Sequence, residues 1–435
     1  DPDEVSLYTC GPTVYNYAHL GNLRSFVFAD ILKRSLLYFG YKVNHVTNIT
    51  DVGHLVSDAD EGEDKVEKAV KREGKSAKEV TNFYTQDFLK DLKALNVDSK
   101  STKFPKATDY IKEQIALVQK LETKNLTYKT SDGIYFDTSK FKKYGELGGI
   151  DLEGLKEGAR VENNSEKKNP TDFALWKFSG NEKRQQEWDS PWGVGFPGWH
   201  IECSAMSMEL LGEQIDIHTG GIDHIPVHHN NEIAQSESAT GKEFSSFWMH
   251  NQLLNVQNGK MAKSAENFLR LQSVIDKGIH PLSYRYYLLQ AHYRSPIAFS
   301  WEAVEASQTA LKRLSDHVKN LPKNGSVSEK YLKMFNSHIG DDLDTPAAMA
   351  LIWTLLKDES IVDNDKRATV QEFDRVLGLN LFEISFNEDT EVPPEVQKLA
   401  QEREEARKSK DWQTADKLRD EIEAKGFIVH DTEKG

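Results

Sequence analysis

The sequence has few cysteines and no long apolar run. Only Cys10 and Cys203 occur in 435 residues, which argues against a disulfide-stabilised scaffold and predicts a reducing, cytoplasmic setting that leaves both thiols free for chemistry. No apolar stretch approaches the roughly 20 residues that cross a bilayer. The first residues lack the basic and apolar parts of a signal peptide, so we expect no membrane attachment.

An excess of basic charge is also missing. The net charge is −14, with 55 Lys and Arg against 69 Asp and Glu, which disfavours general affinity for nucleic acid. It does not exclude one particular RNA, because a large acidic protein can carry a basic face. The hydrophobic content of 38% and the charged content of 29% are typical of a globular protein, and the length suffices for about two to four domains.

The first predicted unit is a strand, a turn and a helix. Residues 5–9 are β-branched and aromatic, and residues 25–39 show helical periodicity, so the helix is expected to begin near His19 and Asn22. A helix N-terminus attracts anions, and Gly21 lets a phosphate or a base approach the backbone. The alternative for this segment is an ordinary helix cap beside a core cysteine.

A second strand over residues 41–47 would complete a β-α-β unit and predicts a doubly wound α/β domain with a parallel sheet. Thr50 and Asp51 follow at the carboxyl edge, where such sheets bind ligands. Both are site candidates, although these residue types are also common turn formers at strand ends.

Residues 58–190 are highly charged and predict an insertion that divides this domain. We expect helices over 69–95 and 107–124, a hairpin around 131–133 and a strand over 172–177. The charges are interpreted as solvated helix faces, and no catalytic residue is assigned to them. Residues 191–198 are rich in Gly and Pro and predict a loop.

Four potential metal ligands stand in the two halves of the predicted sheet domain. Cys10 ends a strand, Cys203 lies in the first turns of a helix over 199–212, and His228 and Glu232 share one face of a later helix. Thiolate, imidazole and carboxylate are zinc ligands, and thiolates select zinc over magnesium. Each of these residues, taken alone, also fits a helix cap or a core thiol. The four can form one metal site only if both halves of the domain meet in one sheet.

A glycine-led loop at residues 258–264 follows a predicted strand pair, 246–250 and 253–256. Its Lys260 and Lys263 can bring two positive charges to a polyphosphate. A solvated basic turn is the alternative. Before it, Gly220, Gly221 and Asp223 form the predicted turn after a strand over 215–219.

Together these motifs resemble the cysteinyl-tRNA synthetase family of class I aminoacyl-tRNA synthetases. His19-Leu20-Gly21-Asn22 is similar to the "HIGH" signature, and residues 260–264 to the "KMSKS" signature, with Ala262 in place of the usual Ser. Residues 10–15, 48–51, 198–206 and 228–236 resemble stretches specific to the cysteine enzyme. The resemblance extends into the tail and covers nearly the whole chain.

The resemblance implies a Rossmann-like parallel sheet split by an insertion, then an α-helical bundle and a small C-terminal helical segment. Bundle and stem-contact helices are expected over 275–289, 301–318, 331–339, 347–356 and 368–377. The expected domains are 1–57 and 191–257 for the two catalytic halves, 58–190 for the insertion, 258–300 for the lysine loop and stem-contact region, 301–380 for a tRNA-binding bundle, and 381–435 for the anticodon side.

It also implies ATP-dependent activation of L-cysteine and transfer to the 3′ end of tRNA(Cys) by a cytoplasmic monomer. One Zn²⁺, held by Cys10, Cys203, His228 and Glu232, would select the cysteine thiolate, and Mg²⁺ would accompany ATP. The implied ATP contacts are His19, Gly21, Asn22, Gly220, Gly221, Asp223 and Lys263. The implied cysteine contacts are Thr50, Trp199, Cys10 and Cys203. The implied catalytic residues are His19, Asn22, Lys260 and Lys263.

Two other functions remain as alternatives. A ligase that joins cysteine to an amino sugar in mycothiol synthesis shares the first half, but it needs no long helical C-terminus. A catalytically silent paralogue that binds RNA or cysteine has no need of the lysine loop. The tail contains a basic and aromatic cluster that could contact the anticodon: Arg403, Arg407, Lys408, Lys410 and Trp412. The alternative is a helix stabilised by pairs of Glu and Arg side chains.

Overall fold

A five-stranded parallel sheet is the centre of the computed structural model. The structure describes residues 3–53, 64–150, 166–180, 184–256, 259–260, 268–386, 394–409 and 411–425. The chain forms two compact units, residues 1–384 and 385–435. In the first, the strand order is β3-β2-β1-β8-β9, and neighbouring strands run parallel. The strands are β1 (Glu4–Thr9), β2 (Lys42–Thr47), β3 (Thr102–Lys103), β8 (Ile215–Gly221) and β9 (Ser245–Asn251).

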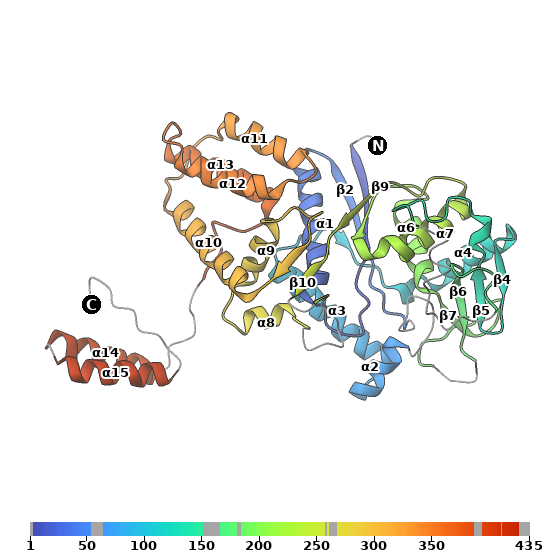
Figure 1. Cartoon of the computed structure of the whole chain (residues 1–435), viewed down its shortest axis with the longest axis horizontal. Helices are drawn as coiled ribbons and strands as arrows, with labels where there is room; N and C mark the ends of the chain where they lie inside the picture. The colour runs from blue at the N-terminus through green and yellow to red at the C-terminus, as the bar shows by residue number, and fades with distance from the viewer. Residues whose placement is uncertain are drawn as a thin grey trace. The chain divides into compact units, whose positions relative to one another are not determined.

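Helices α1 (Leu20–Tyr38) and α6 (Trp199–Leu211) cover opposite faces of this sheet (Figure 1). Because alternate strand residues share a face, Tyr8 and Cys10 both point toward α6 and pack in one core with Cys203. Strand β1 pairs with β2 on one side and with β8 on the other, so the two predicted halves meet in one sheet. The predicted parallel α/β fold is confirmed.

The segment between the halves is built from helices and a second, antiparallel sheet of order β4-β5-β6-β7. Its elements are α2 (Lys65–Glu73), α3 (Ala77–Ala94), a 3₁₀ turn (Ala107–Tyr110), α4 (Ile111–Thr123), β4 (Thr127–Lys129), β5 (Gly133–Phe136), a 3₁₀ turn (Thr138–Lys140), β6 (Phe173–Phe178) and β7 (Gly195–Pro197). The hairpin and the strand near 172–177 are confirmed.

Three predictions about these strands are wrong. Strand β3 lies in the range expected for the insertion, yet it pairs with β2 at the edge of the central sheet. The predicted loop over 191–198 contains β7, because pairing with β6 keeps that short stretch extended. Strand β8 continues through Gly220 and Gly221, which were expected in a turn, because they pair with the end of β9.

A short turn of 3₁₀ helix (Ile222–His224) and a π-helical turn (Ile225–His229) lead from β8 into α7 (Asn230–Thr240). Both strands predicted after α7 are present, but they do not pair, because β9 joins the central sheet while β10 (Leu254–Val256) joins a small sheet with β11 (Gly259–Lys260) and β12 (Ile297–Phe299). The helix expected over 275–289 is two helices, α8 (Leu271–Ile275) and α9 (Pro281–Leu289). Gly278, with φ +72°, separates them.

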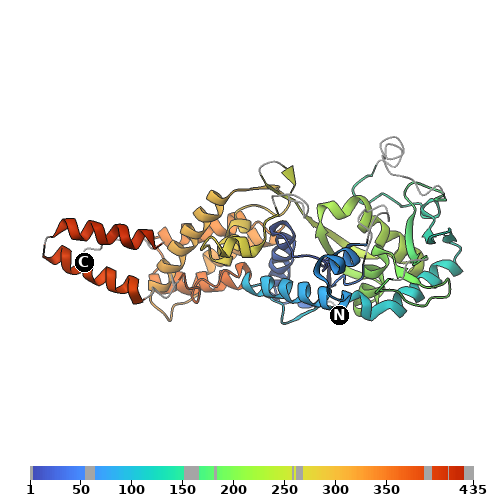
Figure 2. The ribbon, with the colours of Figure 1, turned by 90° about the horizontal axis from the view of Figure 1, so that it is seen from below.

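Four amphipathic helices complete the first unit and lie side by side in both ribbon views (Figures 1 and 2). They are α10 (Trp301–Asn320), α11 (Glu329–Gly340), α12 (Thr345–Lys357) and α13 (Asp363–Leu377). In the second unit α14 (Pro394–Lys408) packs against α15 (Trp412–Ala424), and Lys425 lies 3.2 Å from Glu395. Within the described residues, no helix has both the length and the apolar character that a bilayer crossing requires.

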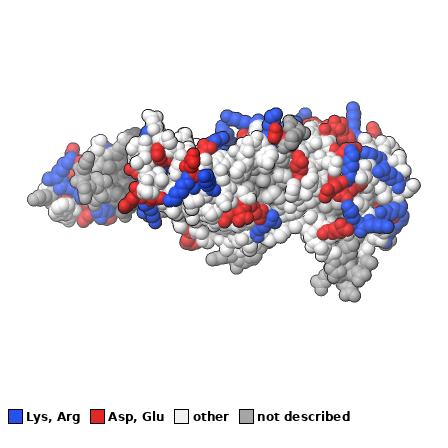
Figure 3. All heavy atoms as spheres, turned by 90° about the horizontal axis from the view of Figure 1, so that it is seen from above, with Lys and Arg blue, Asp and Glu red and all other residues white. Residues whose placement is uncertain are grey.

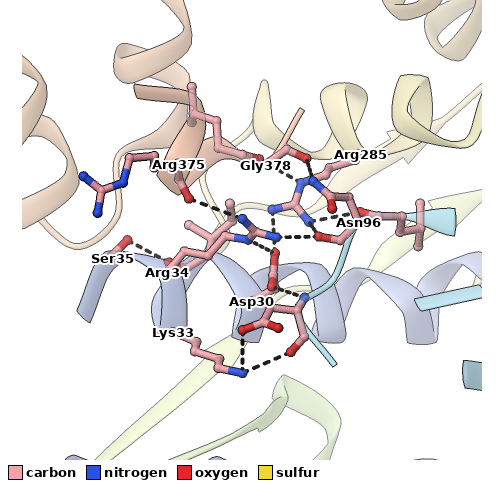
Figure 4. A network of polar contacts seen from close by, with 12 residues as sticks. Asp30, Lys33, Arg34, Ser35, Asn96, Arg285, Arg375 and Gly378 are labelled. Carbon is pink, nitrogen blue, oxygen red and sulfur yellow. Dashed lines mark hydrogen bonds and ion pairs between the residues drawn. The ribbon is translucent and has the colours of Figure 1, made fainter. Parts of the chain in front are cut away.

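A buried polar network joins α1 to α9 and α13 (Figure 4). The fully buried Arg285 donates to Asp30 at 2.6 Å and to the carbonyls of Leu377 and Leu95 at 2.8 and 3.1 Å. Arg34 also binds Asp30, at 2.8 Å. The network therefore fixes α1, whose other end forms part of the site described below, against the helices that follow β10.

Candidate functional site

The carboxyl edge of the central sheet borders a cavity of about 800 Å³. The segment between β1 and α1, the helices α1, α2, α3 and α6, the end of β8 and the turn after it supply the residues that line it. A second cavity of about 100 Å³ shares His19, Asn22, Gly221 and Asp223 with the first and extends to Leu254 on β10. The edge of the sheet at which a ligand was expected therefore borders a cavity.

His19 caps the N-terminus of α1 in this cavity. Its Nδ1 accepts a hydrogen bond from the backbone N–H of Asn22 at 3.0 Å, and the Asn22 Oδ1 accepts from the His19 N–H at 3.2 Å. Because Nδ1 is an acceptor, a neutral His19 carries its proton on Nε2. The cap thus places the Nε2–H of the ring at the same end of α1 as the positive end of the helix dipole.

The loops after β1 and β2 approach one another closely. The Gly11 N–H donates to Asn48 Oδ1 at 2.7 Å, and Asn48 Nδ2 donates to Thr50 Oγ1 at 3.0 Å. A side chain at position 11 would place its Cβ 1.5 Å from the Asn48 carbonyl oxygen, so only glycine fits. These contacts fix the backbone next to Cys10.

The four predicted metal ligands come together beside the cavity. Cys10, Cys203, His228 and Glu232 are all buried, and one donor atom from each lies within 4.8 Å of the other three. His228 Nε2 is 3.0 Å from Glu232 Oε1, as the spacing of four residues predicts. Cys10 also lines the cavity, and Trp199, another lining residue, has its ring 4.6 Å from that of His228.

The electrostatics of this cluster favour one thiolate and one carboxylate. A hydrogen bond with Cys10 lowers the pKa of Cys203 to about 7, while burial raises the pKa of Cys10 well above its usual value. Burial opposes ionisation of Glu232, but the neighbouring His218 and His228 hold its pKa far below the usual range. Burial likewise opposes protonation of His228, but Glu232 raises its pKa to about 10.

Further histidines, which were not predicted as site residues, surround the cluster. His218 Nε2 lies 3.0 Å from Glu232 Oε2, His229 Nε2 lies 3.4 Å from the Cys10 sulfur, and His200 Nδ1 lies 2.9 Å from His228 Nδ1. Cys10, His218, His229 and Glu232 form a second compact donor set. A signal that His218 belongs near the site was available, because alternate residues of a strand share a face of the sheet. His218 of β8 pairs with Tyr8 of β1, and it therefore lies on the same face as Tyr8 and Cys10, which follows β1.

The other predicted site residues fall into three groups. His19, Asn22, Trp199, Gly221 and Asp223 line the large cavity, and Gly21 lines the smaller one. Thr50 and Gly220 are buried and are not among the described residues that line either cavity. The backbone of Lys260 lies in β11, while Lys263 lies outside the described residues.

The structure also assigns a charged helix to the site, against expectation. Lys65, Lys68 and Arg72 of α2 line the large cavity together with Tyr84 and Phe88 of α3. The pattern of charges alone had predicted a solvated helix face. Their spacing at i, i+3 and i+7 places them on one side of a helix, and that side borders the cavity.

Solved structures of other proteins share this fold. Two structures of Mycobacterium tuberculosis methionyl-tRNA synthetase, both with methionyl-adenylate, match with TM-scores of 0.58 and 0.60 at 15% identity. They cover 86% and 87% of this chain, and in each case 90% of that chain. The chain thus has the fold of a class I aminoacyl-tRNA synthetase.

Sequence comparisons define the family more narrowly. The model of the class I (C) tRNA synthetase catalytic domain matches residues 1–309, and that of the cysteinyl-tRNA ligase anticodon-binding domain matches residues 389–435. Cysteine–tRNA ligase 1 of Burkholderia lata is 49% identical over 99% of this chain and 92% of that protein. The enzyme of Treponema denticola is 45% identical over 98% of this chain and 94% of that protein. The chain belongs to the cysteinyl-tRNA ligase family, which confirms the resemblance and the prediction of an aminoacyl-tRNA synthetase.

Proposed function

We propose that this protein activates L-cysteine with ATP to cysteinyl-adenylate and transfers the cysteinyl group to the 3′ end of tRNA(Cys). One observation carries the proposal: Cys10, Cys203, His228 and Glu232 converge beside a cavity that is also lined by His19 and Asn22. The near full-length similarity to cysteine–tRNA ligases supports it.

The chemistry of the donor set fits one zinc ion. Two thiols, an imidazole and a carboxylate are buried together, and these are the ligand types that zinc prefers. Cys10, Cys203, His228 and Glu232 would hold the ion, with the His218 ring orienting the second oxygen of Glu232. Bound there, Zn²⁺ supplies a soft Lewis acid that favours the thiolate of cysteine over the hydroxyl of serine.

Discrimination against serine requires an interaction of this kind with the side-chain atom. Cysteine and serine differ by one atom, and shape alone discriminates near-isosteres by only about 1–3 kcal/mol. The cavity reaches the donor cluster through Cys10, Trp199 and His224, so a small amino-acid side chain can approach it from the same space that an adenylate would occupy. Thr50, Trp199, Cys10 and Cys203 are therefore proposed as the cysteine site.

In the first step the cysteine carboxylate attacks the α-phosphorus of ATP and pyrophosphate leaves, so no side-chain nucleophile is required. His19 Nε2–H and the first N–H groups of α1 would stabilise the developing negative charge. We propose Lys260 and Lys263 as the partners of the departing pyrophosphate, with Mg²⁺ accompanying ATP. Gly21, Asn22, Gly220, Gly221 and Asp223 are proposed for the nucleotide itself.

The tRNA is proposed to bind beyond this site. Residues 301–380 would contact the tRNA and residues 381–435 the anticodon side, in line with the anticodon-binding domain model that matches the tail. A cytoplasmic monomer remains a prediction.

The test is ATP–pyrophosphate exchange with L-cysteine and with L-serine, followed by charging of a tRNA(Cys) transcript. We expect exchange with cysteine, a kcat/KM for serine lower by at least about 10⁴-fold, and charging of the transcript. Exchange without charging would favour the cysteine–amino sugar ligase. Absence of exchange with either amino acid would favour the silent paralogue and contradict the proposal.

A further inference from the structure

An aromatic contact at the start of α1 adds a residue to the site that was not predicted there. The ring of Phe268 lies edge-to-face against the imidazole of His19, with the ring centres 6.0 Å apart and the planes at 82°. The outer surface offers less, because basic and acidic side chains lie intermixed on the face that Figure 3 shows. The contact matters because the proposed reaction uses His19 at the phosphates of ATP.

Two neighbouring residues also limit the orientation of the His19 ring. Its Nδ1 accepts the hydrogen bond from the Asn22 N–H at 3.0 Å. A Cβ at position 21 would lie 3.1 Å from both Cε1 and Nδ1 of the ring, so Gly21 leaves the room that the imidazole needs. Rotation of the ring about its Cβ–Cγ bond would disturb the hydrogen bond at Nδ1 and the contact with Phe268 together. Both contacts therefore fix the direction of Nε2–H.

The segment that carries Phe268 is itself attached to the residues around His19. The N–H of Leu20, the first residue of α1, donates to the Leu269 carbonyl at 2.9 Å. The guanidinium of Arg270 lies over the Tyr17 ring, 4.1 Å from its centre. The two residues that follow Phe268 are thus fixed on either side of His19 in the sequence, which holds the Phe268 ring in place.

These attachments also make the His19 ring more important for an anion. Two of the first three N–H groups of α1 already have acceptors, Leu20 in the Leu269 carbonyl and Asn22 in the His19 ring. They are less available to a phosphate than the donors of an uncapped helix N-terminus. The His19 Nε2–H therefore provides more of the proposed hydrogen bonding, and an error in its direction would lower the rate.

Resting on the proposed function, we infer that Phe268 is a positioning residue for the first step, whose ring holds the His19 imidazole with Nε2–H directed at the reacting phosphate. Phe268 is not among the described residues that line either cavity, so it acts through His19 and not by touching the substrates. Since Phe268 closely follows the lysine loop in the chain, the contact also connects two segments that are proposed to bind ATP.

The experiment begins with Phe268→Leu, which keeps an apolar side chain but removes the ring. We expect kcat for cysteine-dependent pyrophosphate exchange to fall by at least about 10-fold, while KM for ATP and for cysteine changes by less than about 2-fold, because lost orientation is felt in the transition state. Phe268→Tyr keeps the ring and should retain most of the wild-type kcat. Titration of active sites by adenylate formation corrects each kcat for the fraction of folded protein.

The decisive comparison repeats Phe268→Leu in a His19→Asn protein. Asparagine is a good N-cap residue, so this background keeps the cap of α1 and removes the imidazole. If Phe268 acts through His19, the added Phe268→Leu should lower kcat by no more than about 2-fold. Phe83→Leu is the matched control, because the Phe83 ring makes a similar edge-to-face contact with Tyr17 at 6.1 Å but is not among the described residues lining the cavity. We expect this control to keep the wild-type kcat.

Three results would overturn the inference: a wild-type kcat in Phe268→Leu, a loss that appears in KM alone, or a full additional loss in the His19→Asn background. Failure of the proposed function gives a different result, because the wild-type enzyme itself would then show no cysteine-dependent exchange.

Discussion

The donor cluster at Cys10 and the network at Asp30 are both buried and polar, but their charges are arranged in opposite ways. In the network, Asp30 accepts from Arg285 at 2.6 Å, from Arg34 at 2.8 Å and from the Asp98 N–H at 2.8 Å, so donors and acceptors match (Figure 4). In the donor cluster, two thiols, an imidazole and a carboxylate converge within 4.8 Å. A buried cluster of metal-ligand types invites a cation, whereas a buried cluster that contains its own guanidinium serves the fold.

The largest expected effect comes from removing one sulfur. Cys203→Ala should reduce the zinc content from about one ion per chain to nearly none and lower kcat/KM for cysteine in pyrophosphate exchange by more than about 100-fold, because it removes a proposed ligand of the ion. Metal analysis of the purified protein and the exchange assay measure both.

His229→Ala serves as the comparison, since His229 belongs only to the alternative donor set. We expect this variant to keep most of its zinc. Retention of zinc by Cys203→Ala together with its loss from His229→Ala would instead establish Cys10, His218, His229 and Glu232 as the ligands.

The next effect concerns the network. Arg285→Met removes a fully buried cation, so Asp30 keeps only Arg34 and the Asp98 N–H as donors and two carbonyls lose their contact with the guanidinium; the free energy of unfolding should fall by about 3–5 kcal/mol. Denaturant unfolding checks this. Zinc content should not change, because the variant leaves the donor cluster intact.

Arg294→Met is the matched control for that variant. Arg294 also pairs with an aspartate, Asp342, at 2.5 Å, but its side chain is 55% exposed. Its loss should cost no more than about 1 kcal/mol. An equal decrease in the free energy of unfolding for Arg285→Met and Arg294→Met would show that burial does not determine how much the Asp30 network contributes to stability.

The smallest expected effect concerns a third kind of buried polar group, a histidine that contacts hydroxyl groups. The ring of His45 on β2 forms hydrogen bonds with three hydroxyl groups, those of Thr9 at 2.9 Å, Thr102 at 3.2 Å and Thr47 at 3.3 Å. Burial lowers its pKa to about 3, against about 6.5 in the unfolded chain. Between these values only the unfolded chain binds the proton, so His45 stabilises the fold fully above pH 6.5, and this stability is lost as the pH falls toward 3.

From pH 7 to pH 5.5, the free energy of unfolding of the wild-type protein should therefore fall by about 1 kcal/mol more than that of His45→Asn. Any loss of metal over this range affects both proteins and cancels in the difference. Parallel pH profiles of the two proteins would show that His45 is protonated in the folded state.

Local patterns predicted the parts of the site that lie within single elements. The strand-turn-helix unit, the His19 cap and the pairing of His228 with Glu232 follow from spacings of a few residues. The prediction that Cys10 lies near Cys203 also assumed that both halves of the domain share one sheet. The pairing of β1 with β8 confirms this assumption.

Contacts that depend on tertiary packing could not be predicted. Asp30 and Arg285 are 255 positions apart, and neither stands in a local pattern that indicates a buried pair. The charged run of α2 is equally compatible with solvent and with a cavity, because the direction in which a helix face points is set by the elements packed against it. The short strand β7 formed for a similar reason, since β6 provides its hydrogen bonds.

The most direct test of the zinc-based selection uses cobalt(II) in place of zinc, because cobalt–thiolate bonds give a charge-transfer absorption. We predict that adding L-cysteine to the cobalt-substituted protein increases this absorption beyond that of Cys10 and Cys203, and that L-serine leaves it unchanged. A protein that activates cysteine while this absorption stays constant would contradict the account.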